Sequence, residues 1–133
     1  MAILIGVILA LSVGLFASGV GLDRDRAFYP TVTIVIAGYY VLFAAMGGSR
    51  ETLIIESLVA IAFTAAAATG FKVSLWLAVA ALAAHGGLDL VHAELIANPG
   101  VPIWWPPFCM AYDLTAAAYL AWILRKPRPG LRP

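Results

Sequence analysis

The chain has few charged residues for its length. Asp, Glu, Lys and Arg make up 11% of its 133 residues, whereas 63% are hydrophobic. A water-soluble domain has about a quarter of its residues charged, so this composition excludes an ordinary soluble domain. The formal net charge is only +1, which provides no basic surface of the kind that binds nucleic acid. The composition therefore predicts an integral membrane protein without a nucleic-acid partner.

Cysteine is almost absent as well, because Cys109 is the only one in the sequence. A single thiol excludes an intramolecular disulfide and a CxxC metal or redox motif. The first apolar segment also lacks the preceding basic residues of a secretory signal peptide, so we interpret it as a retained membrane helix. No internal repeat of the transporter kind is detectable. The polar residues within the apolar segments are therefore the features of this sequence that bear on function.

Five apolar segments are long enough to cross a membrane as helices. A helix needs about 20 apolar residues to span a hydrocarbon core of ~30 Å. Pro30 and Pro106-Pro107 lie where two of the segments begin, which is the position in a helix that tolerates proline. We therefore predict an all-α, polytopic membrane protein with one transmembrane helical bundle over residues 1–126. Its helices are predicted at about 2–21, 29–47, 51–71, 73–96 and 105–125.

The positive charges are distributed unevenly between the two sides of the predicted membrane. Lys and Arg concentrate in cytoplasmic loops, and a cytoplasmic C-terminus leaves only Arg50 on the outer side. The inner side then has Arg24, Arg26, Lys72, Arg125, Lys126, Arg128 and Arg132. We therefore predict that the N-terminus lies outside and that residues 127–133 form a basic cytoplasmic tail.

Three of the predicted helices have a carboxylate at a similar depth. At a rise of 1.5 Å per residue, Glu56, Asp89 and Asp113 lie roughly 9, 13 and 12 Å below the outer ends of their helices. A charge inside the membrane costs at least about 2.5–3.5 kcal/mol, so such residues usually face the bundle interior and have partners. We therefore expect the third, fourth and fifth helices to meet at a polar pocket that opens outward.

The fourth predicted helix has its polar residues on one face. His85, Asp89 and His92 follow an i, i+4, i+7 spacing, which stacks them along one side of a helix. Imidazole nitrogen and carboxylate oxygen suit zinc, iron or manganese. The two histidines are roughly 10.5 Å apart along the axis, so both reach one ion only with extended side chains. A His–Asp pair, with the other histidine orienting a ligand or relaying protons, is the easier arrangement.

The fifth predicted helix adds Cys109 and Asp113 at an i, i+4 spacing, with Tyr112 adjacent, and the second helix can add Tyr39 or Tyr40. A lone membrane cysteine is more often a small buried apolar residue than a nucleophile. We predict a divalent metal, either zinc, iron or manganese, as the cofactor. The predicted metal ligands are His85, Asp89, His92 and Asp113, and the predicted catalytic residues are Asp113, Tyr112 and Glu56.

Residues 85–113 resemble a pattern found in uncharacterised small bacterial integral membrane proteins. That pattern reads His-x3-Asp-x2-His, a proline-bounded loop, then Cys-x3-Asp, and the loop here contains Asn98-Pro99 and Val101-Pro102. The resemblance implies a bacterial protein, for which we expect the inner (plasma) membrane. It also implies one shared site but no particular reaction. That site would consist of His85, Asp89, His92, Cys109 and Asp113.

Three functions are compatible with such a pocket. The preferred one is a metal-dependent enzyme that acts on a lipid or another hydrophobic small molecule. The second is a non-catalytic membrane subunit or ligand-binding protein, in which the polar cluster only holds helices together. The third is an oligomeric transporter or proton conduit, against which the restriction of the cluster to the outer half is an argument. The expected partners are the lipid bilayer, a hydrophobic ligand, and further copies of the chain or a membrane complex.

Overall fold

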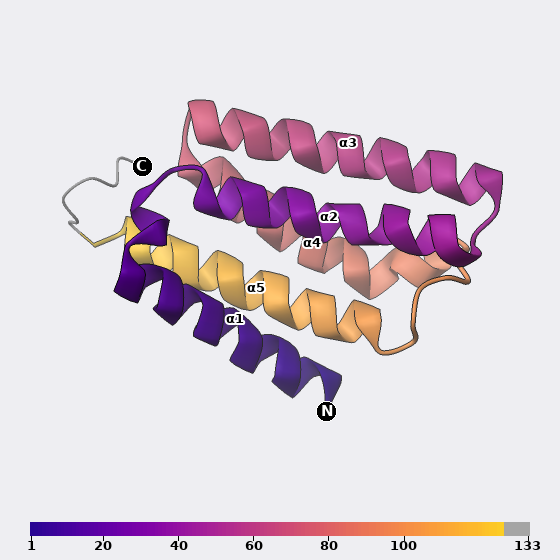
Figure 1. The fold of residues 1–133 in the computed structure, drawn as a ribbon, viewed down its shortest axis with the longest axis horizontal. Helices are drawn as coiled ribbons and strands as arrows, with labels where there is room; N and C mark the ends of the chain where they lie inside the picture. Colours follow the sequence, from indigo (N-terminus) through magenta and orange to yellow (C-terminus); the bar gives the residue numbers. More distant parts are fainter. Residues whose placement is uncertain (127–133) are drawn as a thin grey trace.

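The computed structural model describes residues 1–126, which form five α-helices and no strand (Figure 1). The elements are α1 (Ala2–Val20), the short 3-10 helix η1 (Leu22–Arg24), α2 (Phe28–Gly47), α3 (Arg50–Lys72), α4 (Leu75–Leu95) and α5 (Trp105–Leu124). All five α-helices are long and apolar enough to cross a membrane. This confirms the predicted all-helical architecture, and each helix begins and ends within two residues of its predicted range. The predicted basic tail, residues 127–133, lies outside the described residues.

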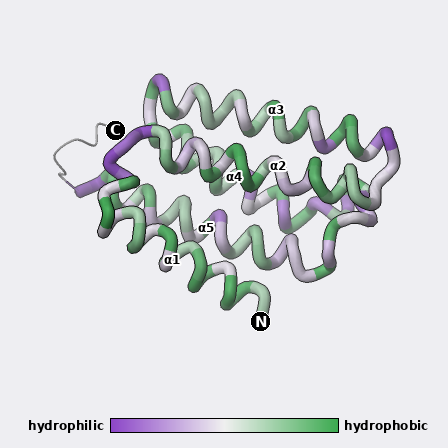
Figure 2. Tube along the Cα trace, in the orientation of Figure 1, coloured by the Kyte–Doolittle hydropathy of each residue, from purple (hydrophilic) through white to green (hydrophobic). Residues whose placement is uncertain are grey.

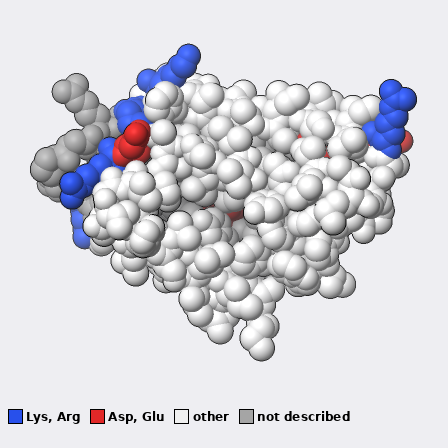
Figure 3. All heavy atoms as spheres, viewed as in Figure 1, with Lys and Arg blue, Asp and Glu red and all other residues white. Residues whose placement is uncertain are grey.

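The helices pack side by side as a bundle, with α1 at one edge. α5 lies between α1 and α4, while α3 contacts both α2 and α4. Figure 2 shows the most hydrophilic stretches of chain concentrated near the ends of the helices. In Figure 3 the Lys and Arg side chains likewise lie at the two ends of the visible face, and no Lys or Arg side chain is visible in the belt between them. This distribution suits helices that cross an apolar layer.

Small residues allow α5 to approach both of its neighbours closely. A Cβ atom added to Gly6 of α1 would lie 2.4 Å from the backbone oxygen of Phe108. A Cβ atom added to Gly86 of α4 would lie 3.2 Å from the Cβ of Asp113. Close backbone contact through glycine is typical of membrane helices, which gain no hydrophobic driving force from one another. At Gly86 this contact brings the polar residues of α4 and α5 together.

Candidate functional site

A buried group of four side chains lies where α4 meets α5. His85 and Asp89 come from α4, Cys109 and Asp113 come from α5, and one ligand atom of each lies within 4.8 Å of the others. Their side chains are almost fully buried, with exposed fractions of 1%, 4%, 2% and 0% respectively. Each helix contributes its pair at an i, i+4 spacing, which places both members on one face. We call these residues the four-residue cluster.

His85 is the centre of the contacts in the four-residue cluster. Its Nδ1 lies 2.7 Å from Oδ2 of Asp113 and 3.7 Å from Oδ2 of Asp89. The Cys109 thiol lies 3.8 Å from the same Asp113 oxygen. Tyr40 of α2 donates a hydrogen bond of 2.6 Å to Oδ1 of Asp89. Three helices are therefore joined through one set of polar contacts.

Two carboxylate oxygens of the four-residue cluster are left without a donor. Oδ2 of Asp89 and Oδ1 of Asp113 are buried and have no hydrogen-bond partner among the described residues. A buried polar atom without a partner costs about 1–3 kcal/mol, and more when it is charged. A cation held among these residues would offset the negative charge of the two carboxylates, and its possible ligand atoms are one thiol sulfur, one imidazole nitrogen and carboxylate oxygens. Zinc and iron are bound by such mixed donor sets, so the residues present fit a metal ion.

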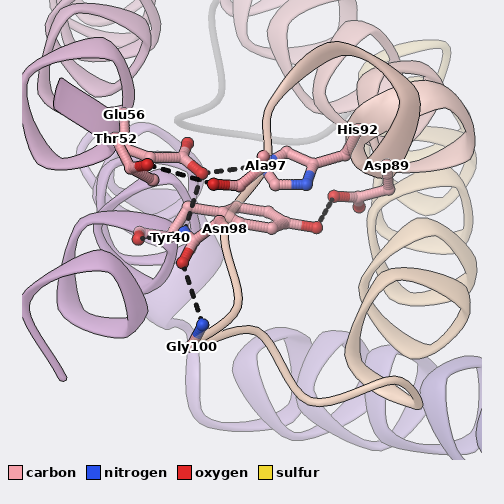
Figure 4. A network of polar contacts seen from close by, with 8 residues as sticks. All are labelled: Tyr40, Thr52, Glu56, Asp89, His92, Ala97, Asn98 and Gly100. Carbon is pink, nitrogen blue, oxygen red and sulfur yellow. Dashed lines mark hydrogen bonds and ion pairs between the residues drawn. The ribbon is translucent and has the colours of Figure 1, made fainter. Parts of the chain in front are cut away.

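A second polar cluster lies between α3, α4 and the α4–α5 connection (Figure 4). Oε1 of Glu56 lies 2.9 Å from Nε2 of His92 and accepts a hydrogen bond of 2.8 Å from Nδ2 of Asn98. The Tyr40 ring stacks on the His92 ring, with 4.0 Å between their centroids. Because the hydroxyl of Tyr40 also reaches Asp89, this tyrosine joins the second cluster to the four-residue cluster.

The α4–α5 connection is fastened to α2 and α3 by side chains at the same level. Asn98 donates a second hydrogen bond, of 3.2 Å, to the backbone oxygen of Tyr40. The Asn98 side chain also accepts one from the backbone N–H of Gly100. Thr52 of α3 donates to the backbone oxygen of Ala97 at 3.0 Å. Figure 4 shows these contacts gathered on one side of Tyr40, with Asp89 on the other.

The structure divides the predicted site residues between the two clusters. His85, Asp89 and Asp113 lie together in the four-residue cluster. His92 points to Glu56 instead, so Cys109 rather than His92 is the fourth potential ligand. Glu56 of α3 meets α4 through His92, whereas Asp113 of α5 meets α4 through His85. The three carboxylates therefore belong to two neighbouring clusters, which Tyr40 of α2 joins, rather than to the single pocket expected from the sequence.

The remaining aromatic candidates lie on different sides of the bundle. Tyr112 is partly buried and lines a groove next to Cys109. Of the two neighbouring tyrosines of α2, Tyr40 reaches the buried polar groups, while Tyr39 lines the same groove as Tyr112. Asn98 was not predicted as a site residue, because an Asn-Pro-Gly sequence reads as a turn. Its position just after the polar face of α4 was the available signal.

The fold and the four-residue cluster together define a membrane-spanning helical bundle with a candidate metal centre. No protein-family model, curated protein or solved structure matches the chain.

Replacing Glu56 with leucine is expected to lower the free energy of unfolding by about 1–3 kcal/mol, because the buried ring nitrogen of His92 loses its partner and the partly buried amide of Asn98 loses one of its two acceptors. Glu56→Gln keeps an acceptor oxygen and should cost less. Thermal unfolding in detergent, followed by circular dichroism, measures both. Glu51→Leu is the matched control, because Glu51 is exposed in the first turn of the same helix. Equal melting temperatures of the Glu56→Leu and Glu51→Leu proteins would contradict a structural role for the second cluster.

Proposed function

We propose that the protein is an integral membrane metalloprotein in which His85, Asp89, Cys109 and Asp113 bind a zinc, iron or manganese ion. The observation that carries the proposal is their convergence within 4.8 Å in the bundle interior, together with two buried carboxylate oxygens that lack a donor. Uncompensated carboxylates are expensive in a membrane interior, and a bound cation offsets that cost. The thiol favours zinc or iron over magnesium or calcium, which prefer oxygen ligands.

The proposed location is the inner membrane of a bacterium, with the N-terminus outside and the C-terminus in the cytoplasm. If all five candidate spans cross the membrane, the two termini lie on opposite sides. Arg24, Arg26 and Lys72 then share the cytoplasmic side with Lys126, while Arg50 lies outside. The excess of basic residues on one side supports this orientation.

The proposed activity is a metal-dependent reaction on a lipid or another hydrophobic molecule. A bound metal ion of this class supplies Lewis acidity toward a substrate oxygen or activates a water molecule. Among the chain's own residues, Tyr40 would hold the ligand Asp89 in place by its hydrogen bond. Tyr112 is proposed as the hydrogen-bond donor to the substrate, because it lines the groove beside Cys109.

A structural function is the second candidate. The contacts of His85 with Asp113, at 2.7 Å, and of Tyr40 with Asp89, at 2.6 Å, join α2, α4 and α5 directly. With a proton shared in each contact, the cluster would hold helices together without an ion. The two functions differ in whether the purified protein contains metal.

Elemental analysis of protein purified in mild detergent without chelator tests the proposal. The expected result is nearly one zinc, iron or manganese per chain, with the bound metal lost in Asp113→Asn. Glu94→Gln, an exposed carboxylate on α4, is the matched control and should keep the metal. If wild-type protein contains no metal even after reconstitution with each ion, the metal proposal is wrong and the structural function is favoured.

A further inference from the structure

A groove with a volume of about 610 Å³ runs between α1, α2 and α5. This volume is within the range of pockets that bind small molecules. Its walls are mostly apolar, and they include Leu9 and Val13 of α1, Val32, Val35 and Ile36 of α2, and Phe108 of α5. If α1, α2 and α5 cross a membrane, as their length and composition allow, this groove lies at the level of the lipid acyl chains.

The groove reaches the four-residue cluster through Cys109. Cys109 lines the groove, and its thiol lies 3.8 Å from a carboxylate oxygen of Asp113. Figure 3 shows the corresponding face hollowed near its middle, with acidic atoms visible inside the hollow. A molecule in the groove would therefore lie directly beside the proposed metal ligands.

Polar side chains line the groove along the first half of α5. Tyr39, Tyr112 and Trp105 all line it, and the Tyr39 and Trp105 rings are in contact, with 4.8 Å between their centroids. Trp and Tyr side chains at the end of a membrane helix typically lie in the interface region, where the lipid carbonyl groups are. Tyr39 and Tyr112 thus give the groove two phenol groups, which are hydrogen-bond donors for an oxygen acceptor.

We propose that the groove binds one acyl chain of a fatty acid or fatty acyl ester, and that its carboxyl or ester group lies near Trp105 and Tyr112. This inference rests on the proposed function and names its substrate class. From Tyr39 to Ala27 the groove follows α2 over roughly 18 Å, at 1.5 Å per residue, which accommodates an extended hydrocarbon chain. The apolar walls hold that chain. The tyrosine hydroxyls bind the carboxyl or ester oxygen and place it beside Cys109.

Photo-crosslinking with palmitic acid that has a diazirine in its chain tests the proposal on the intact protein in detergent. The expected adducts, mapped by mass spectrometry, lie on the groove-lining residues of α1, α2 and α5. Excess unlabelled palmitic acid should compete, whereas hexadecane, which has the same chain length but no acceptor, should compete poorly. Tyr112→Phe removes the Tyr112 hydroxyl. In this variant the concentration of palmitic acid needed for half-maximal competition should rise roughly three- to tenfold. Equal competition by hexadecane would overturn the proposal.

A narrowed groove provides the second arm of the test. In the double variant Val13→Phe/Val32→Phe, two rings fill the groove, and labelling should be lost while metal content stays unchanged. Leu58→Phe is the matched control, because Leu58 is 61% exposed on α3 and does not line the groove. Unchanged labelling in the double variant, with metal present, overturns the groove proposal alone. Specific labelling of a metal-free wild type would overturn the metal function while supporting acyl binding.

Discussion

Replacing His85 with glutamine is expected to remove the bound metal, whereas the same replacement at His92 should leave it in place. Nδ1 of His85 lies within 3.7 Å of both aspartates of the four-residue cluster, so this imidazole would be a direct ligand of an ion bound among them. Nε2 of His92 is instead paired with Glu56. We expect the affinity to fall by more than about 100-fold in His85→Gln, above the range that is typical of residues that only orient a ligand.

Metal titrations of the two histidine variants, with circular dichroism melting curves as the folding control, measure this difference. If His85→Gln does not fold, Cys109→Ala serves as the second variant, because it removes a ligand while keeping a small apolar side chain. Equal loss of metal in both histidine variants would restore the ligand set predicted from the sequence. Full retention in His85→Gln and Cys109→Ala would place the metal outside the four-residue cluster.

The sequence predicts the helices well because membrane thickness sets the length of each apolar segment. The largest difference in their bounds is at α4, which begins at Leu75 rather than residue 73. Ser74 explains the difference, because its side chain accepts a hydrogen bond from the backbone N–H of Trp76 and caps the helix. Hydropathy does not reveal a cap of this kind, so the predicted start of α4 lies two residues before the observed one.

The candidate site is predicted less completely, because spacing along one helix does not specify which neighbour each residue meets. His85 and His92 do share a face of α4, but α4 contacts both α3 and α5. His85 meets Asp113 of α5, and His92 meets Glu56 of α3. Assigning each histidine to its carboxylate requires the order of helices around the bundle, which one sequence does not contain.

The two tyrosines of α2 illustrate the same limit. Consecutive residues of a helix point about 100° apart, since a turn contains 3.6 residues, so Tyr39 and Tyr40 must face different surroundings. Tyr40 is buried against His92 and Asp89, while Tyr39 contacts Trp105 along the groove. Their different roles follow from the rotation of α2 relative to its neighbours rather than from the residue type.

Replacing Gly100 with alanine is expected to lower the free energy of unfolding by about 3 kcal/mol, at the upper end of the usual cost of overpacking. A Cβ atom at this position would lie 1.9 Å from the backbone oxygen of Phe43 and 3.2 Å from the backbone nitrogen of Gly47. Both atoms belong to the backbone of α2, so a side-chain rotation does not relieve the contact. The α4–α5 connection has to move, and with it Asn98, which binds Glu56 and the backbone oxygen of Tyr40.

Gly38→Ala is the matched control for this substitution, because an added Cβ atom there has no neighbour within 4 Å. Alanine also favours a helix interior over glycine by up to ~1 kcal/mol, so Gly38→Ala should be neutral or slightly stabilising. Thermal unfolding of both variants in the same detergent gives the comparison. A Gly100→Ala protein as stable as Gly38→Ala would mean that the connection does not pack against α2 as described. Destabilisation in Gly100→Ala alone would support the contact that holds Asn98, and with it Glu56, in the second cluster.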